Sequence, residues 1–281
     1  MRDVNKSELA ELVADYDRAG FAYVRRLFEP AELAPLIDAL DEGGGSPGGF
    51  AVTDSEGGQQ ELSVWLELGN DLIGVIPRLE PIVAIATAAV GEPVYHWHSK
   101  LSWKRPGTTS LWDWHQDYGF WSEFGVARPA MCTIAVALGP VDTANGCLQL
   151  VPASHLLGAL PVESVGQTRA SEPTAVAAAI ESDGIEHCEL EPGDAVVFHA
   201  NTLHGSGPNA SSRPRTMLMS SYNALTNPPT GTTHYAPSRL DVVPPTALAN
   251  GERAVFGSSQ LIDPETEALN QGLTTTMNDH P

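Results

Sequence analysis

One ten-residue stretch, from Trp112 to Trp121, holds the side chains best suited to chemistry. In it His115 and Asp117 lie two residues apart among five aromatic rings. If the backbone is extended, residues two apart point to the same side, so both side chains would reach one point. With a second histidine from elsewhere, they would form the 2-His-1-carboxylate face typical of non-haem Fe(II) sites. The alternative is a buried histidine hydrogen-bonded to an aspartate in a β core, because polar groups among aromatic rings need a partner.

The segment 199–215 supplies the groups that such a site still needs. His204 follows an apolar strand, and two nearby glycines allow a ligand to approach the backbone closely. Arg215 begins the next strand, so we expect a hairpin to place it beside His204, with its planar guanidinium suited to a carboxylate. Arg213 is the weaker alternative because a proline separates it from the strand. His199 is expected to face the core or to support His204.

Two of the three lysines in the chain, Lys100 and Lys104, lie just before the aromatic stretch. They are either solvated residues at strand ends or part of a wall that faces an anion. The alternation expected for the strand places His96, His98 and Lys100 on one face. The two histidines are therefore either pocket residues or structural ones.

Helical patterns come first along the chain and short strands come later. A capping box over 5–8 opens a predicted helix that runs to about Arg18, and further helices are predicted from Pro30 and over 77–90. Strands are predicted over 21–24, 94–103, 130–138, 146–151, 195–199 and 216–222. This order indicates an α+β protein, mainly β, whose second half is a sandwich or barrel.

The chain shows no confident internal boundary, so we predict a single domain over 1–281. Its expected parts are a helical N-terminal part (about 1–92), a β core (about 93–223) and an irregular C-terminal tail (about 224–281). Two segments are candidate lids: the glycine-rich run 43–49 and the small-residue segment 161–184. The alternative prediction for the second segment is an alanine-rich helix.

Charge and composition exclude several classes of function. The formal charge of −20 argues against nucleic-acid binding, because phosphates would be repelled. No apolar run approaches the roughly 20 residues of a membrane span, and the N-terminus lacks the apolar segment of a signal peptide. We therefore expect a soluble cytoplasmic protein with no membrane partner. The three cysteines lack paired spacing, which indicates free thiols.

The combination of His115-x-Asp117, His204 and an arginine eleven positions later resembles the phytanoyl-CoA dioxygenase family of Fe(II)- and 2-oxoglutarate-dependent oxygenases. The stretches WHQDYGFW, NGCLQLVPASH and FHANTLHGSGPN stand where the family carries comparable sequence, within roughly 94–222. The resemblance implies a double-stranded β-helix core, of jelly-roll or cupin type, with the N-terminal helices packed on it.

The resemblance also implies roles for individual residues. The Fe(II) ligands would be His115, Asp117 and His204. 2-Oxoglutarate would chelate the metal through its keto and C1 carboxylate oxygens, and O₂ would be the co-substrate. The residues implied to contact 2-oxoglutarate are Arg215 for the distal carboxylate, Ser206 as its helper and, more weakly, Gln149 and Asn145. The intact carboxylate favours hydroxylation over halogenation, with release of succinate and CO₂.

The substrate is suggested by a narrower likeness. The stretches HSKL, NGCLQ and SYNALTNPP are most similar to the bacterial branch that acts on small polar molecules, such as aminoethylphosphonate-type dioxygenases and ectoine hydroxylases. We therefore predict hydroxylation of an unactivated C–H bond in an amine-bearing or zwitterionic molecule. The candidate substrate-binding residues are Lys100, Trp114, Tyr118, Trp121 and His98. The alternatives are a tailoring oxygenase in antibiotic or modified amino acid biosynthesis, and a non-catalytic jelly-roll binding protein.

Overall fold

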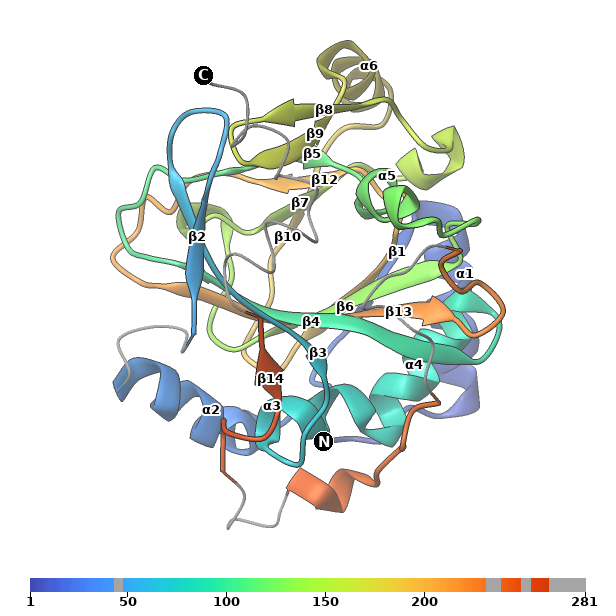
Figure 1. Cartoon of the computed structure of the whole chain (residues 1–281), viewed down its shortest axis with the longest axis vertical. Helices are drawn as coiled ribbons and strands as arrows, with labels where there is room; N and C mark the ends of the chain where they lie inside the picture. Colours follow the sequence, from blue (N-terminus) through green and yellow to red (C-terminus); the bar gives the residue numbers. More distant parts are fainter. Residues whose placement is uncertain (43–47, 231–238, 249–253, 263–281) are drawn as a thin grey trace, which may run out of the picture.

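Two β-sheets face each other, and helices cover the outer side of the larger sheet (Figure 1). The computed structural model describes residues 1–42, 48–230, 239–248 and 254–262. All paired strands are antiparallel. This is the predicted jelly-roll architecture, with helices packed on a mainly β core.

The larger sheet has eight strands. Across the sheet they are β1 (Phe21–Val24), β11 (Ala195–His199), β6 (Met131–Ala137), β13 (Arg215–Ala224), β4 (Val94–Lys104), β3 (Gln59–Glu67) and β14 (Gln260–Leu261), with β2 (Phe50–Thr53) paired to β3. The smaller sheet is β10 (Glu186–Cys188), β7 (Leu148–Leu150), β12 (His204–Ser206) and β5 (Trp112–His115). The long strands β4 and β13 lie side by side in the middle of the larger sheet and face the smaller one.

The first helix, α1 (Lys6–Ala19), begins and ends as its sequence predicts. The side chain of Asn5 accepts hydrogen bonds from the backbone N–H groups of Ser7 and Glu8, and the Glu8 carboxylate accepts one from the Asn5 N–H. Gly20 then ends the helix in the left-handed conformation, with φ of 83°.

The helix predicted over 77–90 is α4 (Glu80–Val90), which begins three residues later than predicted. Before it lie α3 (Leu72–Val75) and a 3-10 turn (Ile76–Arg78). Leu79 is extended, so α4 begins only after it, and Pro81 fits the first turn, where a missing N–H costs no hydrogen bond. The helix α2 (Pro30–Glu42) starts where it was predicted to start.

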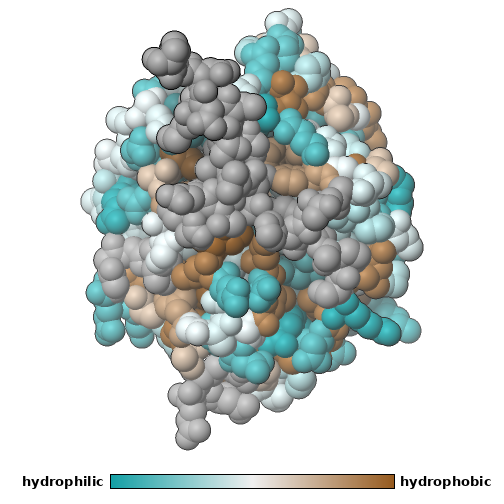
Figure 2. Space-filling view, in the orientation of Figure 1, coloured by the Kyte–Doolittle hydropathy of each residue, from teal (hydrophilic) through white to brown (hydrophobic). Residues whose placement is uncertain are grey.

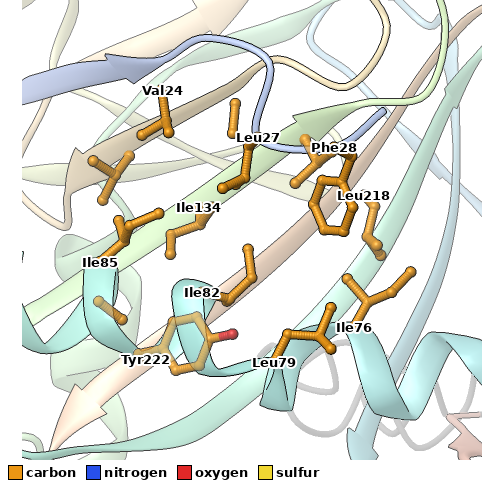
Figure 3. Close-up of a cluster of buried hydrophobic side chains, with 14 of the residues drawn as sticks. Val24, Leu27, Phe28, Ile76, Leu79, Ile82, Ile85, Ile134, Leu218 and Tyr222 are labelled. Carbon is orange, nitrogen blue, oxygen red and sulfur yellow. The ribbon is translucent and has the colours of Figure 1, made fainter. Parts of the chain in front are cut away.

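The main hydrophobic core lies between these helices and the outer face of the larger sheet. Ile82 and Ile85 of α4 point toward Ile134 of β6 and Leu218 of β13 (Figure 3). The Tyr222 hydroxyl closes the core by donating to the Pro77 carbonyl, at 2.7 Å. With the outer face covered in this way, the inner face of the sheet is left for the pocket.

The prediction of a helical part over 1–92 is only partly right, because β1, β2 and β3 also lie in it. Strand β3 pairs with β4 and extends the larger sheet. Its consecutive residues 62–65 are all buried, so the two-residue alternation of a half-exposed strand is missing. That loss of alternation explains why the sequence pattern did not reveal the strand.

The segment 161–184 is a β-hairpin followed by a helix. The strands are β8 (Val162–Val165) and β9 (Thr168–Ser171), and the alanine-rich helix α6 (Pro173–Asp183) follows as one of the two alternatives predicted. Gln167 at the hairpin turn exchanges hydrogen bonds with the backbone of Thr53. A lid role for the hairpin stays a prediction. Most of the other candidate lid, 43–49, lies outside the described residues.

The described part of the tail is mostly irregular, as expected, although β14 returns to pair with β3.

No helix in the described ranges is long and apolar enough to cross a membrane. All three cysteines are free and buried, which confirms the prediction of unpaired thiols. On the face drawn in Figure 2, hydrophobic residues reach the surface near the middle of the view, with hydrophilic residues at the sides and below them.

Candidate metal centre and anion pocket

His115, Asp117 and His204 lie together between the two sheets. His204 at the start of β12 pairs directly with His115 at the end of β5, and their ring centroids are 4.1 Å apart. Each Nε2 lies 3.9 Å from Oδ1 of Asp117, and the three potential ligand atoms all fall within 4.8 Å of one another. The extended backbone predicted for this stretch continues through Gln116, and Asp117 is the first residue of the short helix α5 (Asp117–Trp121).

Both imidazoles keep the nitrogen that faces the carboxylate free of a proton. Nδ1 of His115 donates to the Asp113 carbonyl at 2.7 Å, and Nδ1 of His204 donates to the Thr202 carbonyl at 2.9 Å. A carbonyl only accepts, so in the neutral rings the lone pair remains on Nε2. Burial lowers the pKa of His204 to about 3 and also lowers the pKa of His115. Both rings are therefore neutral near pH 7, as metal ligation requires.

The carboxylate of Asp117 is ionised and held in one orientation. Burial acts to raise its pKa, but His204, Lys100 and His115 together hold the pKa below its usual value. Oδ2 accepts a hydrogen bond from the Thr133 hydroxyl at 3.2 Å, and that hydroxyl is 2.8 Å from the Ser221 hydroxyl. Because these contacts hold Oδ2, Oδ1 remains directed at the two histidines.

Gln116 fixes the backbone between the two ligands. Its side-chain amide donates to the carbonyls of Gly158 and Asn201 and accepts from the Leu160 N–H. The Gln116 side chain thus points away from the triad, as the alternation of an extended backbone requires. It also joins the His115 segment to the loop that leads into His204.

The triad fits a divalent transition metal. Two neutral imidazole nitrogens and one carboxylate oxygen converge on a single point, which is the ligand set and geometry of a non-haem Fe(II) site with open positions. The alternative of a histidine hydrogen-bonded to an aspartate does not fit, since 3.9 Å is too long for a hydrogen bond in either pair.

A cationic pocket adjoins the triad. Arg215 of β13 and Lys104 of β4 are neighbours in register, and they are 3% and 1% exposed. The Lys104 ammonium donates to the Ser206 hydroxyl at 2.9 Å and to the Gly207 carbonyl, and Arg215 donates to the Ser102 hydroxyl at 3.3 Å. Within the described ranges neither cation forms an ion pair, and the buried Arg215 Nε has no hydrogen-bond partner. A buried arginine without an anion, with a buried lysine beside it, indicates an anionic ligand.

The titration of this cation pair supports the same conclusion. Burial, together with the nearby Arg215, lowers the pKa of Lys104 to about 6, and burial lowers the pKa of Arg215 to about 10. A bound carboxylate would reverse both effects by favouring the charged forms. The pocket that contains Arg215 and Ser206 is also lined by His115 and His204, so an anion bound there would adjoin the metal site.

Arg215 reaches the site by a different route from the one predicted. A hairpin was expected to place it beside His204, but β12 belongs to the smaller sheet and β13 to the larger. Arg215 therefore faces His204 across the space between the sheets, on the pocket that both line. Arg213, the weaker alternative, is about half exposed and paired with Asp142.

Two residues expected to contact 2-oxoglutarate are placed elsewhere. Asn145 is fully buried in a capping box with Asp142, and its amide donates to the Pro140 carbonyl, so it stabilises a turn. Gln149 alternates with Leu148, and Leu148 is the one that lines the pocket. Both contacts were predicted from the resemblance to the family's sequence, which does not determine the direction in which a side chain points.

A β-bulge at Trp97 corrects the predicted face of strand β4. Ser221 pairs with His98 and Tyr222 pairs with His96, so β4 carries one extra residue at this point. His96 therefore lies on the helix side, with its ring near Tyr222 and its nitrogens near Leu66 and Ser99. His98 keeps the Lys100 side and packs against Trp121 at 5.5 Å.

The predicted aromatic substrate residues separate into two groups. Trp114 packs with Val151, Val176 and Leu203 in a cluster beneath α6, so it does not line the pocket as predicted. A second irregularity, between Trp112 and His115 in β5, turns Trp112 toward the pocket instead. Tyr118 and Trp121 belong to a separate apolar cluster, where Trp121 still touches His98.

The roles of three residues near the site could not be read from the sequence. Thr133 and Ser221, which orient Asp117, had no signal apart from being polar residues in apolar strands. Lys104 was identified as a possible anion contact, but its place beside Arg215 depends on the register of β4 and β13. His199 was expected to face the core or support His204. It packs against Tyr16 and His155, so the supporting role is wrong.

The chain is similar in sequence to a known protein family and to characterised enzymes. Residues 16–217 match the family model described as phytanoyl-CoA dioxygenase (PhyH). The L-proline trans-4-hydroxylase of Streptomyces griseoviridis is 30% identical over 176 residues, which cover 57% of this chain and 66% of that protein. The ectoine dioxygenase of Bordetella parapertussis is 26% identical over 234 residues, which cover 78% of this chain and 76% of that protein.

Two solved structures show the same fold. EctD from S. alaskensis with bound Fe has a TM-score of 0.69 at 22% identity, covering 84% of this chain and 87% of that chain. The epimerase SnoN in complex with Fe3+, alpha ketoglutarate and nogalamycin RO also has a TM-score of 0.69 at 22% identity, covering 85% and 99%. At this level of identity the likeness describes the fold.

Proposed function

The chain belongs to the phytanoyl-CoA dioxygenase family, and from this premise we propose that it is an Fe(II)- and 2-oxoglutarate-dependent hydroxylase of a small, amine-bearing or zwitterionic molecule. One observation carries the proposal: a 2-His-1-carboxylate triad shares its pocket with a buried arginine that has no anionic partner among the described residues. The first group suits the metal and the second suits the distal carboxylate of the co-substrate.

Each residue then has a defined task. His115, Asp117 and His204 would hold the iron, and the hydrogen bonds to Asp113, Thr202 and Thr133 would keep the ligands in place. The bound iron and 2-oxoglutarate would supply the oxidising chemistry, with O₂ as co-substrate and succinate and CO₂ as products.

The co-substrate contacts follow from the cation pair. Arg215 and Lys104 would hold the distal carboxylate of 2-oxoglutarate, and Ser206 would orient the Lys104 ammonium. The larger and smaller sheets exclude water from both sides, which strengthens these contacts.

The substrate class rests on the relatives and on the pocket. The relatives are named for hydroxylation of proline and ectoine, which are small zwitterions, and this supports those substrates over an aminophosphonate. On the chain itself, Trp112 lines the pocket next to the triad, with its ring centroid 6.1 Å from that of His115. An aromatic face is suited to an organic cation.

A panel assay tests this proposal. The Fe(II)-loaded enzyme is given 2-oxoglutarate and, separately, L-proline, ectoine, 2-aminoethylphosphonate or an antibiotic intermediate, and succinate is measured. A small zwitterion is expected to raise succinate above the substrate-free rate. If only a large intermediate did so, the protein would be a tailoring oxygenase. Binding of metal and 2-oxoglutarate without turnover on any compound would indicate a non-catalytic binding protein.

Binding of 2-oxoglutarate is expected to take up a proton at neutral pH. Lys104 has a pKa of about 6 without an anion, so it is mostly neutral at pH 7.5, and the bound carboxylate favours its charged form. The affinity for 2-oxoglutarate should therefore fall as the pH rises above about 6, by up to about tenfold per unit. Calorimetry of the metal-loaded protein in buffers of different ionisation enthalpy measures the uptake, which Lys104→Met should abolish. Equal heats in all buffers would contradict this assignment.

A further inference from the structure

Lys100 is a third cation of the pocket, and it lies apart from the pair at Arg215. It lies on β4 with its ammonium 5.9 Å from the centre of the Trp112 ring, and both residues line the pocket that contains His115 and His204. Lys100 is partly exposed, whereas Lys104 is buried. The two lysines are four positions apart, which puts their Cα atoms about 13 Å apart along a strand.

The ammonium of Lys100 is close to the metal ligands. Lys100 lines the pocket with His115 and His204, and the Trp112 ring beneath its ammonium lies 6.1 Å from the His115 ring between centroids. Lys100 is therefore beside the triad, whereas the Lys104 ammonium is bonded to Ser206 and Gly207 with Arg215 as its neighbour in register. A molecule bound beside the metal would meet Lys100 and Trp112 together.

Counting charges shows that Lys100 has no counter-ion in the loaded site. The two positive charges of Fe(II) are balanced by the two negative charges of 2-oxoglutarate, and Asp117 offsets only one of the three side-chain cations Arg215, Lys104 and Lys100. None of the residues that line the pocket is acidic, and in the described ranges Lys100 forms no ion pair. The nearby carboxylates of Asp54 and Asp113 already accept hydrogen bonds from backbone N–H groups and hydroxyls. A net positive charge therefore remains in the loaded site, and Lys100 is the cation that lies beside Trp112 and the triad.

We propose that Lys100 binds an anionic group of the substrate, a carboxylate in the first instance, and that Trp112 holds the adjoining part of the same molecule. This inference rests on the proposed function and narrows it, because it makes a negative charge, rather than an amine alone, the feature that the site selects. Such a contact would fix one end of the substrate and so determine which C–H bond faces the metal.

Matched pairs of acids and amides test the inference through binding alone. The protein is loaded with Fe(II) and 2-oxoglutarate without oxygen, and calorimetry measures the Kd of L-proline, L-prolinamide, ectoine and 2-aminoethylphosphonate. At least one acid is expected to bind, and Lys100→Met should raise its Kd by about 10- to 100-fold. Lys100→Arg should restore part of the affinity, and the amide should not respond to either variant. The phosphonate distinguishes a general anion site from one selective for carboxylates.

Lys6→Met is the matched control, since Lys6 is exposed at the start of α1 and far along the chain from the pocket. The inference is overturned if the acid binds Lys100→Met as tightly as the wild type, if the amide is the tighter ligand, or if no acid binds at millimolar concentration. It is also overturned if Lys100→Met weakens 2-oxoglutarate instead of the acid. Failure of iron or 2-oxoglutarate to bind at all would remove the proposed function itself, so the two failures are distinguishable.

Discussion

Replacing Asp117 by alanine should abolish 2-oxoglutarate turnover while leaving the protein folded. The variant removes the one anionic ligand of the triad, and Oδ1 is the atom that both histidines face at 3.9 Å. Changes to residues that merely support metal ligands typically cost about 10- to 100-fold in affinity or activity, so loss of the ligand should exceed about 100-fold. Succinate release by the iron-reconstituted variant measures this loss.

Thermal unfolding separates loss of the metal from loss of the fold. Added Fe(II) should raise the Tm of the wild type, because a ligand that binds only the folded state stabilises it. It should not raise the Tm of the Asp117→Ala variant, whose Tm without metal should stay close to that of the wild type. The control is Asp183→Ala, at the exposed end of α6. Full activity in the reconstituted Asp117→Ala variant would refute the assignment of the metal ligand.

Replacing Arg215 by methionine should raise the KM for 2-oxoglutarate far more than it lowers kcat. Truncating one partner of a buried charge pair costs about 2–5 kcal/mol, which corresponds to about 30- to 4,000-fold in affinity. Saturating 2-oxoglutarate should recover most of the turnover, because the metal ligands are untouched. The KM of Arg215→Lys should lie between those of the wild type and Arg215→Met, since an ammonium keeps the charge but lacks the planar fork of the guanidinium.

The adjacent Arg213 offers a matched control for this experiment. It is half exposed and paired with Asp142 on the surface, so Arg213→Met should leave the KM for 2-oxoglutarate unchanged. Equal effects of the two arginine variants would mean that the co-substrate carboxylate is not bound where the buried cations lie. A drop in kcat at unchanged KM in Arg215→Met would argue against the same assignment.

The grouping of His115, Asp117 and His204 was predictable because its information is largely local. The two-residue spacing of His115 and Asp117 already favoured a shared direction, and His204 follows the apolar strand β11 after a short turn. The alternation of the backbone determines such directions over two or three residues, before any tertiary contact is known. The jelly-roll core was predictable for a related reason, since strands β6, β11 and β13 are apolar runs with clear turns between them.

The predictions that proved wrong concerned side chains whose direction depends on β-bulges and on the register between strands. The bulge at Trp97 adds one residue to β4, and this single residue sends His96 to the helix side while His98 stays on the Lys100 side. The irregularity in β5 likewise turns Trp112 toward the pocket in place of Trp114. No sequence pattern marks either one, because a bulge is selected by pairing with the neighbouring strand. The pairing of Lys104 with Arg215 has the same origin.

One measurement tests the central claim most directly: an anaerobic titration of the Fe(II)-loaded protein with 2-oxoglutarate, followed by the visible charge-transfer absorption of a 2-oxo acid chelated to Fe(II). The wild type should develop the band and saturate at one 2-oxoglutarate per iron. His204→Ala should show no band, and Arg215→Met should show it only at much higher 2-oxoglutarate. Tightly bound iron without a band, or the same band in His204→Ala, would contradict a site built from this triad and this arginine.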